Sequence, residues 1–554
     1  MCLHPSAIQP VPHITALVAR AAFPKGNPYM QIRDTVGTIY QDEDFSDLYP
    51  HDGQPTISPW RLAFVTVMQF IENLTDRQAA DAVRSRIDWK YALGLELTDA
   101  GFDFSVLSEF RARLVAGSAE QRLLDQMLYH FKKSGWLKAG GRQRTDSTHV
   151  LSWARRLTSL ECMGETMRQA LNSLAIIAPQ WLKPHIESDW PERYNRPFGE
   201  YPVPKAEREI VELAETIGRD GFQLLTSIYT DEVQGLQRVK DLQLLREVPA
   251  VQILHQVWTQ NFYHEDGQVR WRRKGSKLPS AVQIRTPHDP EARFSHKRMT
   301  EWEGYKVHLT ETCNEDTPLL ITHVETTEAT LQDVSVVDKI HDDLAQLELL
   351  PEEHVVDLAY VSSDVLVTSE QMGVDLIGPV RSDNSWQAHD PRAFDSSQFR
   401  IDWEAKVATC PQGKSSHSWV QCTDWRDKPA IHAVFRTSDC QACAVRDRCT
   451  KSRYRTLTLQ QQEGYLALQR ARERQQTEDF RQRYQARAGV EGTISQAMYP
   501  RKGRRARYRG LAKTHLQHVA MAAGINLTRA VDWLWERPRA KTRVAPFVTL
   551  ALAA

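Results

Sequence analysis

The sequence predicts an α/β protein with a mixed sheet, preceded by an all-helical region and interrupted by a helical and a cysteine-rich insertion. Three observations support this prediction. Apolar residues recur at helical spacing throughout residues 57–135. Further along the chain, short segments of strand type, among them those with Asp146 and Asp357, alternate with helical ones. Five of the eight cysteines fall together between Cys410 and Cys449.

Charge is distributed unevenly along a chain that is neutral as a whole. The 554 residues include 70 basic and 70 acidic side chains, so a nucleic-acid partner has to be argued from local charge. Between Arg483 and Arg543 there are 14 lysines and arginines against three acids. The hydrophobic share of 41% and the charged share of 25% are those of an ordinary globular protein with several structural units.

The sequence argues against a membrane-bound protein. No run of about 18 apolar residues occurs, and prolines interrupt the amino-terminal segment, which lacks a signal pattern. We therefore expect no membrane partner and a cytoplasmic location.

The amino-terminal part is predicted to comprise an arm over residues 1–50 and a helical DNA-binding domain over residues 51–138. Ser58 and Pro59 are typical of a helix start, and further helices follow after short turns. Short helices with exposed arginines are compatible with a helix-turn-helix reader of DNA. An ordinary helical bundle with solvated cations explains the same pattern, so both interpretations stay open.

The first part of the predicted core spans residues 139–381. It begins with a strand that contains Asp146, and residues 155–262 then form a helical insertion that we expect to pack as its own lobe. After this insertion come a strand hairpin, an amphipathic helix and a short buried strand that ends in Asp357. His308, in the first strand of the hairpin, is expected to face solvent.

The remaining chain divides into three predicted segments. These are a cysteine-rich insertion over residues 382–460, the last part of the core over residues 461–536 and a tail over residues 537–554.

The cysteine spacing predicts a structural zinc site. Cys440 and Cys443 form a C-x2-C pair, Cys449 follows, and Cys410 lies in a second turn, which together give a set of four cysteine ligands. In a reducing compartment such clustering favours a metal over disulfides. Three further side chains are alternative ligands: Cys422, His417 and His432. The competing interpretation is a set of free, partly buried thiols. Because thiolates select zinc over magnesium, this site would take no part in phosphoryl chemistry.

Three carboxylates are candidates for a metal-binding active site. In a mixed sheet the strand with Asp146 would lie beside the later strand with Asp357, and a helix would bring Glu491 over both. Three converging carboxylates would bind two Mg²⁺ ions about 3.5–4 Å apart and promote an in-line displacement at a phosphodiester. Each residue alone has a simpler explanation: a turn, a paired buried carboxylate, or an ion pair of Glu491 with Arg487.

A run of cations follows Glu491 and contains no acid. We call residues 501–513 the basic block, and we expect it to hold a polyanion such as DNA. Its cations are Arg501, Lys502, Arg504, Arg505, Arg507, Arg509 and Lys513.

These motifs together resemble the bacterial insertion-sequence DDE transposases, and among them the IS eleven-eighty-two family within the IS-four/IS-five assemblage. The resemblance extends from about residue 50 to residue 535. It is based on TDST, WEGYKVHL, HVVDLAY, YQARAGVEGTISQAM and RRARYRGLAKTHLQHVAMAAGINLTR. It implies an RNase H-like catalytic core with an Asp, Asp, Glu triad, behind a helical amino-terminal domain.

Residue by residue, the resemblance assigns the triad to Asp146, Asp357 and Glu491. Tyr484 and Arg487 fit a Tyr-x2-Arg-x3-Glu-x6-Lys signature of related transposases, in which they contact DNA. The lysine of that signature is replaced by Met498 in this chain. Two cations of the next turn are candidates to supply its phosphate contact: Arg501 and Lys502.

The resemblance also implies cofactors and partners. It predicts two Mg²⁺ or Mn²⁺ ions, double-stranded DNA in the form of terminal inverted repeats and target DNA, a homodimer on DNA, and association with the nucleoid. Two other functions stay open: a non-catalytic DNA-binding regulator derived from a transposase, and an RNase H-like nuclease that acts on other nucleic acid.

Overall fold

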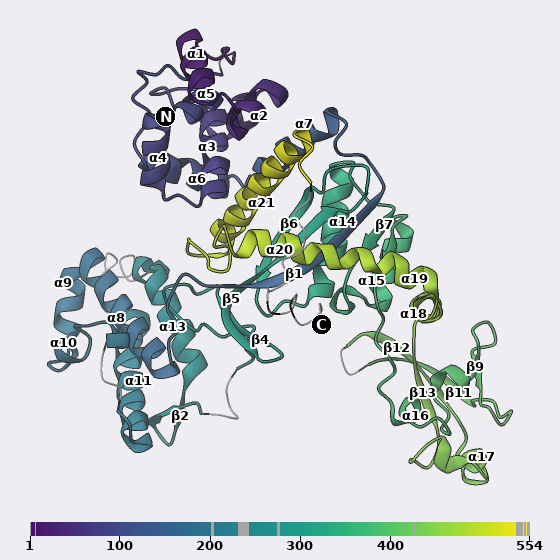
Figure 1. Cartoon of the computed structure of the whole chain (residues 1–554). Helices are drawn as coiled ribbons and strands as arrows, with labels where there is room; N and C mark the ends of the chain where they lie inside the picture. Colours follow the sequence, from purple (N-terminus) through teal and green to yellow (C-terminus); the bar gives the residue numbers. More distant parts are fainter. Residues whose placement is uncertain are drawn as a thin grey trace.

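The computed structural model describes most of the chain. The described residues are 2–5, 7–200, 204–230, 243–273, 278–424, 427–538, 547 and 550. Most of the predicted tail over residues 537–554 therefore lies outside the described residues. In Figure 1 a helical amino-terminal domain lies above the central sheet, and two outgrowths extend below the sheet on opposite sides.

Six strands form the central sheet. They are β1 (Arg142–Leu151), β4 (Arg293–Lys297), β5 (Thr300–Thr312), β6 (Ile321–Glu328), β7 (Glu353–Val355) and β8 (Asp375–Ile377). β1 pairs antiparallel with β5 and parallel with β7, and β7 pairs parallel with β8. β6 pairs with the same stretch of β5 as β1 does, so the main strands lie in the order β6-β5-β1-β7-β8, and β4 pairs with the start of β5. The predicted α/β class with a mixed sheet is confirmed.

The register between β1 and β7 brings two of the candidate acids together. Arg144 on β1 lies opposite Val355 on β7, and the two strands run in the same direction. Continued by two residues, this register puts Asp357 beside Asp146. β7 ends at Val355, so Asp357 lies just beyond the strand and caps the short 3-10 helix η5 (Leu358–Tyr360).

The expectation that His308 faces solvent is wrong. β5 is paired along both edges and almost entirely buried, so His308 is only 1% exposed. Its Nδ1 lies 2.7 Å from the hydroxyl of Tyr360, and its Nε2 lies 3.3 Å from the hydroxyl of Thr327. Burial lowers the pKa of His308 to about 3, so the ring is neutral at physiological pH. Strand alternation alone does not indicate that a strand is covered on both faces.

The amino-terminal domain is helical and shares one hydrophobic core with the sheet. Its helices are α1 (His13–Ala22), α2 (Pro28–Val36), α3 (Pro59–Glu72), α4 (Asp76–Ser85), α5 (Ile87–Leu93), α6 (Ser105–Ala116) and α7 (Arg122–Lys133). The long helix α21 (Leu511–Leu534) packs against α3 and α7 on one side and against β6 on the other. Gly524 allows this close approach, because a Cβ there would lie 2.9 Å from Ile71.

The described residues between 155 and 262 are mostly helical, and we call them the helical lobe. Its helices are α8 (Ser159–Ile177), α9 (Pro179–Leu182), α10 (Trp190–Arg193), α11 (Glu207–Thr230) and α13 (Pro249–Asn261), and the hairpin β2 (Phe262–Glu265) and β3 (Gln268–Trp271) follows. The core of the lobe includes Trp190 and Trp258 and is distinct from that of the sheet. Gly221 accommodates Trp258, since a Cβ at this position would lie 2.1 Å from the indole ring.

The second outgrowth, residues 382–460, contains the cysteines, and we call it the cysteine module. It holds α16 (Trp386–His389), α17 (Thr437–Gln441), the hairpin β9 (Arg400–Asp402) and β10 (Val407–Thr409), and a sheet of β11 (Ser418–Thr423), β12 (Pro429–Val434) and β13 (Thr456–Gln460). Phe399, Phe435 and Leu457 belong to its own small core.

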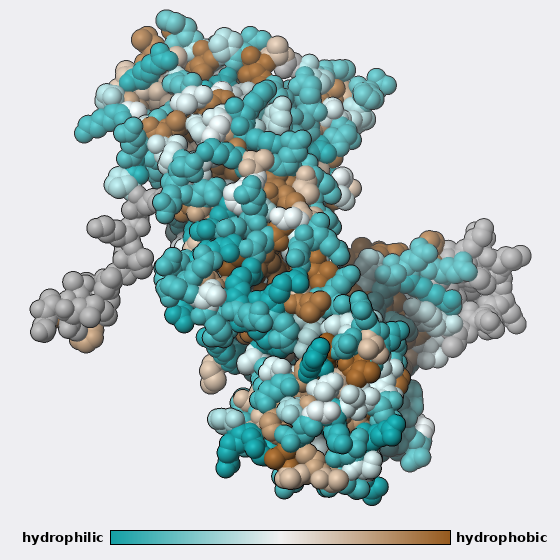
Figure 2. All heavy atoms as spheres, turned by 90° about the vertical axis from the view of Figure 1, so that its right-hand side faces the viewer, coloured by the Kyte–Doolittle hydropathy of each residue, from teal (hydrophilic) through white to brown (hydrophobic). Residues whose placement is uncertain are grey.

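The remaining helices connect these parts. They are α14 (Val337–Gln346), α15 (Ser363–Gln371), α18 (Gln462–Gln475), α19 (Glu478–Tyr484), the 3-10 turn η8 (Gln485–Gly489) and α20 (Val490–Met498). In Figure 1 the run from α18 to α20 returns from the cysteine module and crosses the sheet over β1. The face in Figure 2 is largely hydrophilic, with apolar side chains scattered among polar ones. Within the described residues, no helix combines the length and the apolar character needed to cross a bilayer.

Candidate active site

Asp146 is a nearly buried carboxylate in the middle of β1. Its side chain is 9% exposed, and its Oδ2 lies 2.6 Å from Nη2 of Arg487. Its Oδ1 accepts a hydrogen bond of 2.8 Å from the backbone N–H of Ser147. Burial raises the pKa of Asp146; Arg487 and the Ser147 N–H oppose this shift, whereas the charge of Asp357 adds to it. Arg487 therefore compensates the cost of placing this charge in the sheet.

Asp357 approaches Asp146 from the neighbouring strand. Its Oδ1 accepts a hydrogen bond of 2.7 Å from the N–H of Ala359, which caps η5 and fixes the side chain at the carboxyl end of β7. The effect of Asp357 on the pKa of Asp146 places the two carboxylates within electrostatic range of each other. The parallel register of β1 and β7 explains this proximity.

Glu491 lies in the first turn of α20 and reaches the same region through Arg487. Its carboxylate is 69% exposed, and its Oε1 lies 3.5 Å from Nη1 of Arg487. Burial by itself would lower the pKa of Arg487, but the pKa is raised on balance because several nearby groups stabilise the positively charged form. These groups are Asp146, Tyr484, Asp357 and Glu491. One guanidinium thus lies among all three candidate acids.

Two other positions of the signature have different environments. Tyr484 stacks on Phe480 with ring centroids 5.6 Å apart, and its pKa is raised first by burial and then by Asp357 and Asp146. Met498, where the signature has lysine, is 2% exposed and packs in the main hydrophobic core. A lysine would be buried here, which gives a physical reason for the departure from the signature.

The basic block is partly structural. Arg501 is nearly buried and donates to the backbone carbonyl of Gln496, while Arg504 donates to Thr148 and to the carbonyl of His149 on β1. Two others reach more distant parts of the chain: Arg507 donates to the carbonyl of Leu74, and Arg509 donates to the carbonyl of Pro287.

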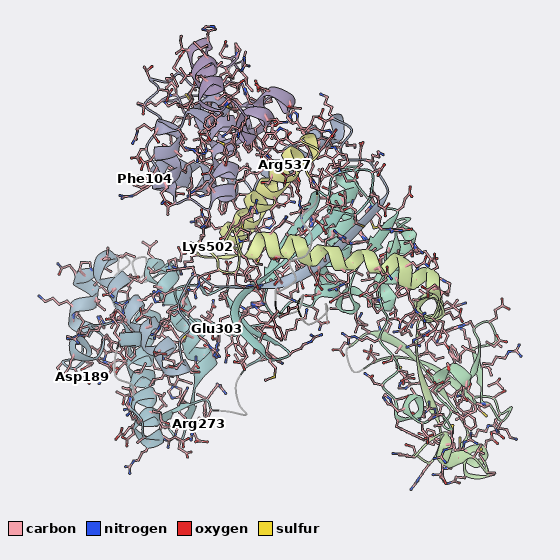
Figure 3. All side chains as sticks on the ribbon, viewed as in Figure 1. Phe104, Asp189, Arg273, Glu303, Lys502 and Arg537 are labelled. Carbon is pink, nitrogen blue, oxygen red and sulfur yellow. The ribbon has the colours of Figure 1, made fainter. Side chains whose placement is uncertain are left out.

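The exposed cations of the block are a smaller set. Lys502, Arg505 and Lys513 are exposed, and their side chains have no hydrogen bond or ion pair with the part of the chain that the structure describes. Figure 3 places Lys502 in the loop between α20 and α21, on the side of the helical lobe. These side chains are available to a polyanion, together with the exposed Arg509.

Sequence reasoning missed the hairpin of β4 and β5 as a possible contact surface. Its two-residue tip consists of Arg298, with a φ of 56°, and Met299, which is 98% exposed. Lys297 precedes the tip and is also exposed, and its charge opposes the rise that burial causes in the pKa of Asp146. The cations of the sequence HKRM, between segments that pair as strands, were the signal that could have indicated this hairpin.

The four predicted zinc ligands line one cavity of about 390 Å³ in the cysteine module. Cys410, Cys440, Cys443 and Cys449 are all free thiols. Burial raises the pKa of Cys449, and the three other thiols add to that shift, so all four lie within electrostatic range. The Sγ of Cys410 accepts the N–H of Lys414 at 3.4 Å. The alternative ligand Cys422 is not among the described residues that line this cavity.

Possible metal-ligand atoms lie closer together in another part of the molecule than in the triad or among the four thiols. Among the described residues, the single set of three whose ligand atoms all lie within 4.8 Å of one another is His323, Glu325 and Asp343; the triad and the thiols are more open. Lys339 already fills this group, with its Nζ 3.1 Å from Glu325 and 2.5 Å from Asp343. Nε2 of His323 lies 2.8 Å from Asp343, so ion pairs satisfy these carboxylates without a metal.

Two further acids, Asp364 and Asp375, follow β7 in the chain, and both pair with cations elsewhere. Asp364 lies 2.5 Å from Nζ of Lys428 in the cysteine module. Asp375 pairs with Arg474 and, at 2.5 Å, with Arg483. The arrangement therefore favours Asp357 as the second acid of the group.

Comparison with known families gives two matches, both to transposase domains. Residues 409–531 match a family model described as Transposase DDE domain, and residues 17–113 match one described as Transposase domain (DUF772). The first match contains Glu491 and the basic block, and the second covers most of the helical amino-terminal domain. No curated protein and no solved structure matches the chain. Two separate segments of the chain are therefore similar to transposase domains, one of them to a DDE domain.

Proposed function

We propose that this chain is a DNA transposase that cleaves the ends of an insertion element and joins them to target DNA by a two-metal DDE mechanism. The observation that supports this most strongly is the environment of Arg487, which lies 2.6 Å from Asp146 and 3.5 Å from Glu491 and within electrostatic range of Asp357. The acids come from a strand, a strand end and a helix that are far apart in the sequence. A surface ion pair does not require such convergence.

The three carboxylates are proposed to hold two Mg²⁺ or Mn²⁺ ions. Carboxylate oxygens suit these hard cations, and the position of Arg487 supports the fit, because one positive charge already lies among the acids. Bound ions would activate the attacking water or 3′-hydroxyl and stabilise the leaving oxygen. Arg487 opposes the rise that burial causes in the pKa of Asp146, and on leaving this carboxylate it would become available to a DNA phosphate.

For the fold of the core we propose an RNase H-like arrangement. Across the sheet the main strands lie in the order β6-β5-β1-β7-β8. β5 is antiparallel to both β1 and β6, and β7 and β8 run parallel to β1. This order supports the proposal, as do the positions of the acids: Asp146 on β1, Asp357 just after β7 and Glu491 on α20. Assignment to the IS eleven-eighty-two family rests on the sequence motifs.

For DNA binding we propose that the exposed cations near the acids hold the backbone of the DNA. They lie in the basic block and on the hairpin of β4 and β5: Lys502, Arg505, Arg509, Lys513, Lys297 and Arg298. Tyr484 and Arg487 would contact the DNA at the cleavage site, and the helical domain of residues 51–138 would read the terminal inverted repeats. We further propose that the protein acts as a homodimer on DNA and is associated with the nucleoid in the cytoplasm.

In the cysteine module we propose a structural zinc ion held by Cys410, Cys440, Cys443 and Cys449. Their shared cavity and electrostatic coupling support this assignment. The module has a small hydrophobic core, and a metal would add stability that this core alone supplies poorly.

The proposed function is tested with full-length protein and duplexes that carry the DNA flanking its reading frame. With Mg²⁺ or Mn²⁺, the wild type should nick the end and join it to target DNA. Asp146→Asn, Asp357→Asn and Glu491→Gln should each reduce nicking at least about 100-fold with unchanged DNA affinity, since several kcal/mol of charge stabilisation is lost. Asp364→Asn, an exposed acid paired with Lys428, is the matched control and should retain activity.

Other outcomes identify the competing functions. Nicking that survives all three substitutions would contradict the proposed triad. Tight binding of the ends without any nicking by the wild type would favour a regulator, and cleavage without joined products would favour a nuclease acting on other nucleic acid.

A further inference from the structure

Glu311 is a fully buried carboxylate that the proposed chemistry does not use. It lies on β5, directly opposite Arg144 on β1, and its side chain is 0% exposed. Its Oε1 accepts from Nε of Arg144 at 2.8 Å and from Nη2 of Arg144 at 2.6 Å. Its Oε2 accepts from the hydroxyl of Thr493 at 2.5 Å and from Nη1 of Arg529 at 2.8 Å. We call Arg144, Glu311, Thr493 and Arg529 the Glu311 network.

The members of this network belong to the segments that carry the candidate active site. Arg144 precedes Asp146 by two residues on β1, and its Nη1 donates to the carbonyl of Ala486 at 2.6 Å, one residue before Arg487. Thr493 follows Glu491 by two residues on α20. The network therefore connects the strand of the first acid with the turn of the arginine and the helix of the third acid.

The turn before α20 is shaped to receive Arg144. A Cβ at Gly489 would lie 2.0 Å from Nη1 of Arg144, so a larger residue would displace the guanidinium from the turn. From the other side, Nη2 of Arg529 on α21 donates to the hydroxyl of Thr493 at 2.5 Å and to the Gln496 side chain at 2.9 Å. α20 is thus held at its inner face by groups from both β5 and α21.

Stability alone is a weak explanation for this arrangement. Burying one carboxylate with two guanidiniums costs desolvation that a well-packed apolar cluster would avoid. In return, charge-assisted hydrogen bonds fix directions and distances more strictly than apolar contacts do. What these bonds fix here is the position of α20 and of η8 relative to β1.

We propose that Glu311 is a positioning residue, which sets the helix of Glu491 and the turn of Arg487 at the distance from Asp146 that metal binding requires. This inference depends on the proposed function of the triad, which it deepens. Glu311 contacts neither metal nor DNA in this account and acts through Thr493 and Arg144.

The test uses Thr493, because Glu311→Gln leaves two buried guanidiniums and can prevent folding. Thr493→Val removes the hydroxyl and keeps the volume, whereas Thr493→Ser keeps the hydroxyl. Thr66→Val is the matched control, since Thr66 is equally buried in a helix but its hydroxyl bonds only to the carbonyl of Leu62 in the same helix. Mn²⁺ is titrated against nicking of end-bearing DNA, and DNA affinity and melting temperature are recorded for each variant.

Thr493→Val should raise the Mn²⁺ concentration for half-maximal nicking at least about fivefold, with DNA affinity unchanged. Thr493→Ser and Thr66→Val should stay close to the wild type. Equal Mn²⁺ requirements for Thr493→Val and the wild type, or equal shifts for Thr493→Val and Thr66→Val, would overturn the proposal. If the wild type does not nick DNA, the proposed function fails, and calorimetric Mn²⁺ binding by the same variants then decides the positioning role separately.

Discussion

At the scale of single residues, Arg487 determines the charge balance of the candidate site. Its guanidinium lies 2.6 Å from Asp146 and 3.5 Å from Glu491, and its charge also interacts with Asp357. In the metal-free protein the guanidinium supplies the positive charge that a metal ion would otherwise bring to the acids. A divalent ion that enters this group must therefore compete with it.

This competition leads to a prediction for Arg487→Gln. Removing a positive charge from the carboxylates should strengthen Mn²⁺ binding to DNA-free protein about tenfold, as a nearby charge typically shifts an ionic equilibrium by one or more powers of ten. Isothermal calorimetry measures this affinity directly. Arg483→Gln is the control, because Arg483 pairs with Glu353 and Asp375 instead. Weaker Mn²⁺ binding by Arg487→Gln would show that Arg487 organises the acids rather than competing for them.

Sequence reasoning at this scale was informative for residues with a distinctive spacing. The spacing of Arg487 and Glu491 indicated an ion pair as the simpler explanation for Glu491, and the structure contains this contact. The arginines of the basic block were indistinguishable in the sequence, although Arg501 and Arg504 bond to the backbone and Lys502 faces outward. Partners of an arginine depend on tertiary contacts, so local sequence does not separate structural cations from available ones.

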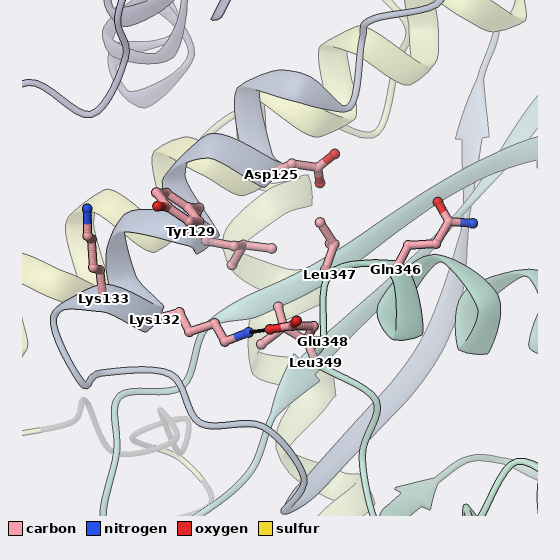
Figure 4. Close-up of a pocket in the computed structure, with 9 residues that line it drawn as sticks. Asp125, Tyr129, Lys132, Lys133, Gln346, Leu347, Glu348 and Leu349 are labelled. Carbon is pink, nitrogen blue, oxygen red and sulfur yellow. Dashed lines mark hydrogen bonds and ion pairs between the residues drawn. The ribbon is translucent and has the colours of Figure 1, made fainter.

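At the scale of secondary-structure elements, α7 carries a half-buried acid, Asp125, beside the turn that follows α14. A cavity of about 530 Å³ between these helices is lined by Asp125, Tyr129 and the ion pair of Lys132 with Glu348 (Figure 4). Burial and the nearby charge of Asp343 raise the pKa of Asp125 to about 7. The interface of the amino-terminal domain with the core thus includes a carboxyl group that resists ionisation.

Asp125→Asn should consequently change how stability depends on pH. Because the pKa of Asp125 is raised in the folded protein, the folded state binds more protons than the unfolded state between about pH 4 and pH 7, and stability falls as pH rises through that window. The asparagine cannot ionise, so the variant should melt about 2 °C or more above the wild type at pH 8, and this difference should shrink as the pH falls and vanish below about pH 4.

Asp316→Asn is the control, because the pKa of Asp316 is shifted in the opposite direction to that of Asp125. Lys138 lowers the pKa of the exposed Asp316, so removing this charge should not stabilise the protein at pH 8. Equal melting temperatures of Asp125→Asn and the wild type at pH 8 would mean that water reaches Asp125 and leaves it ionised.

The elements themselves were predictable to different degrees. The β5–β6 hairpin and the strand before Asp357 followed from apolar alternation, and their pairing is observed. β4 was not predicted, because its exposed residues lack an apolar face and its pairing with β5 is tertiary. The same reason explains the error at His308, whose burial depends on neighbours on both faces of β5.

At the scale of the whole molecule, a sheet that carries the acids is flanked by the helical lobe and the cysteine module. Both outgrowths have separate hydrophobic cores. By contrast, the amino-terminal domain and the sheet share one core, which composition did not indicate. Sequence patterns do not reveal which units pack together.

For the cysteine module we predict that the purified chain contains about one zinc ion. Elemental analysis should detect its loss in the double variant Cys440→Ser, Cys443→Ser, and limited proteolysis should then cleave residues 382–460 faster. Cys2→Ser and Cys162→Ser, which alter buried thiols elsewhere, should keep the metal. A zinc-free wild type with a protease-resistant module would contradict the assignment and favour free thiols.

The central claim is that three acids from distant parts of the chain form one divalent-metal centre. The most direct test is anomalous diffraction from crystals of the full chain soaked in Mn²⁺, which locates each ion independently of activity. We predict anomalous peaks between Asp146, Asp357 and Glu491, with Arg487 displaced from Asp146. Manganese bound only at His323, Glu325 and Asp343, with Arg487 still on Asp146 under saturating Mn²⁺, would contradict the claim.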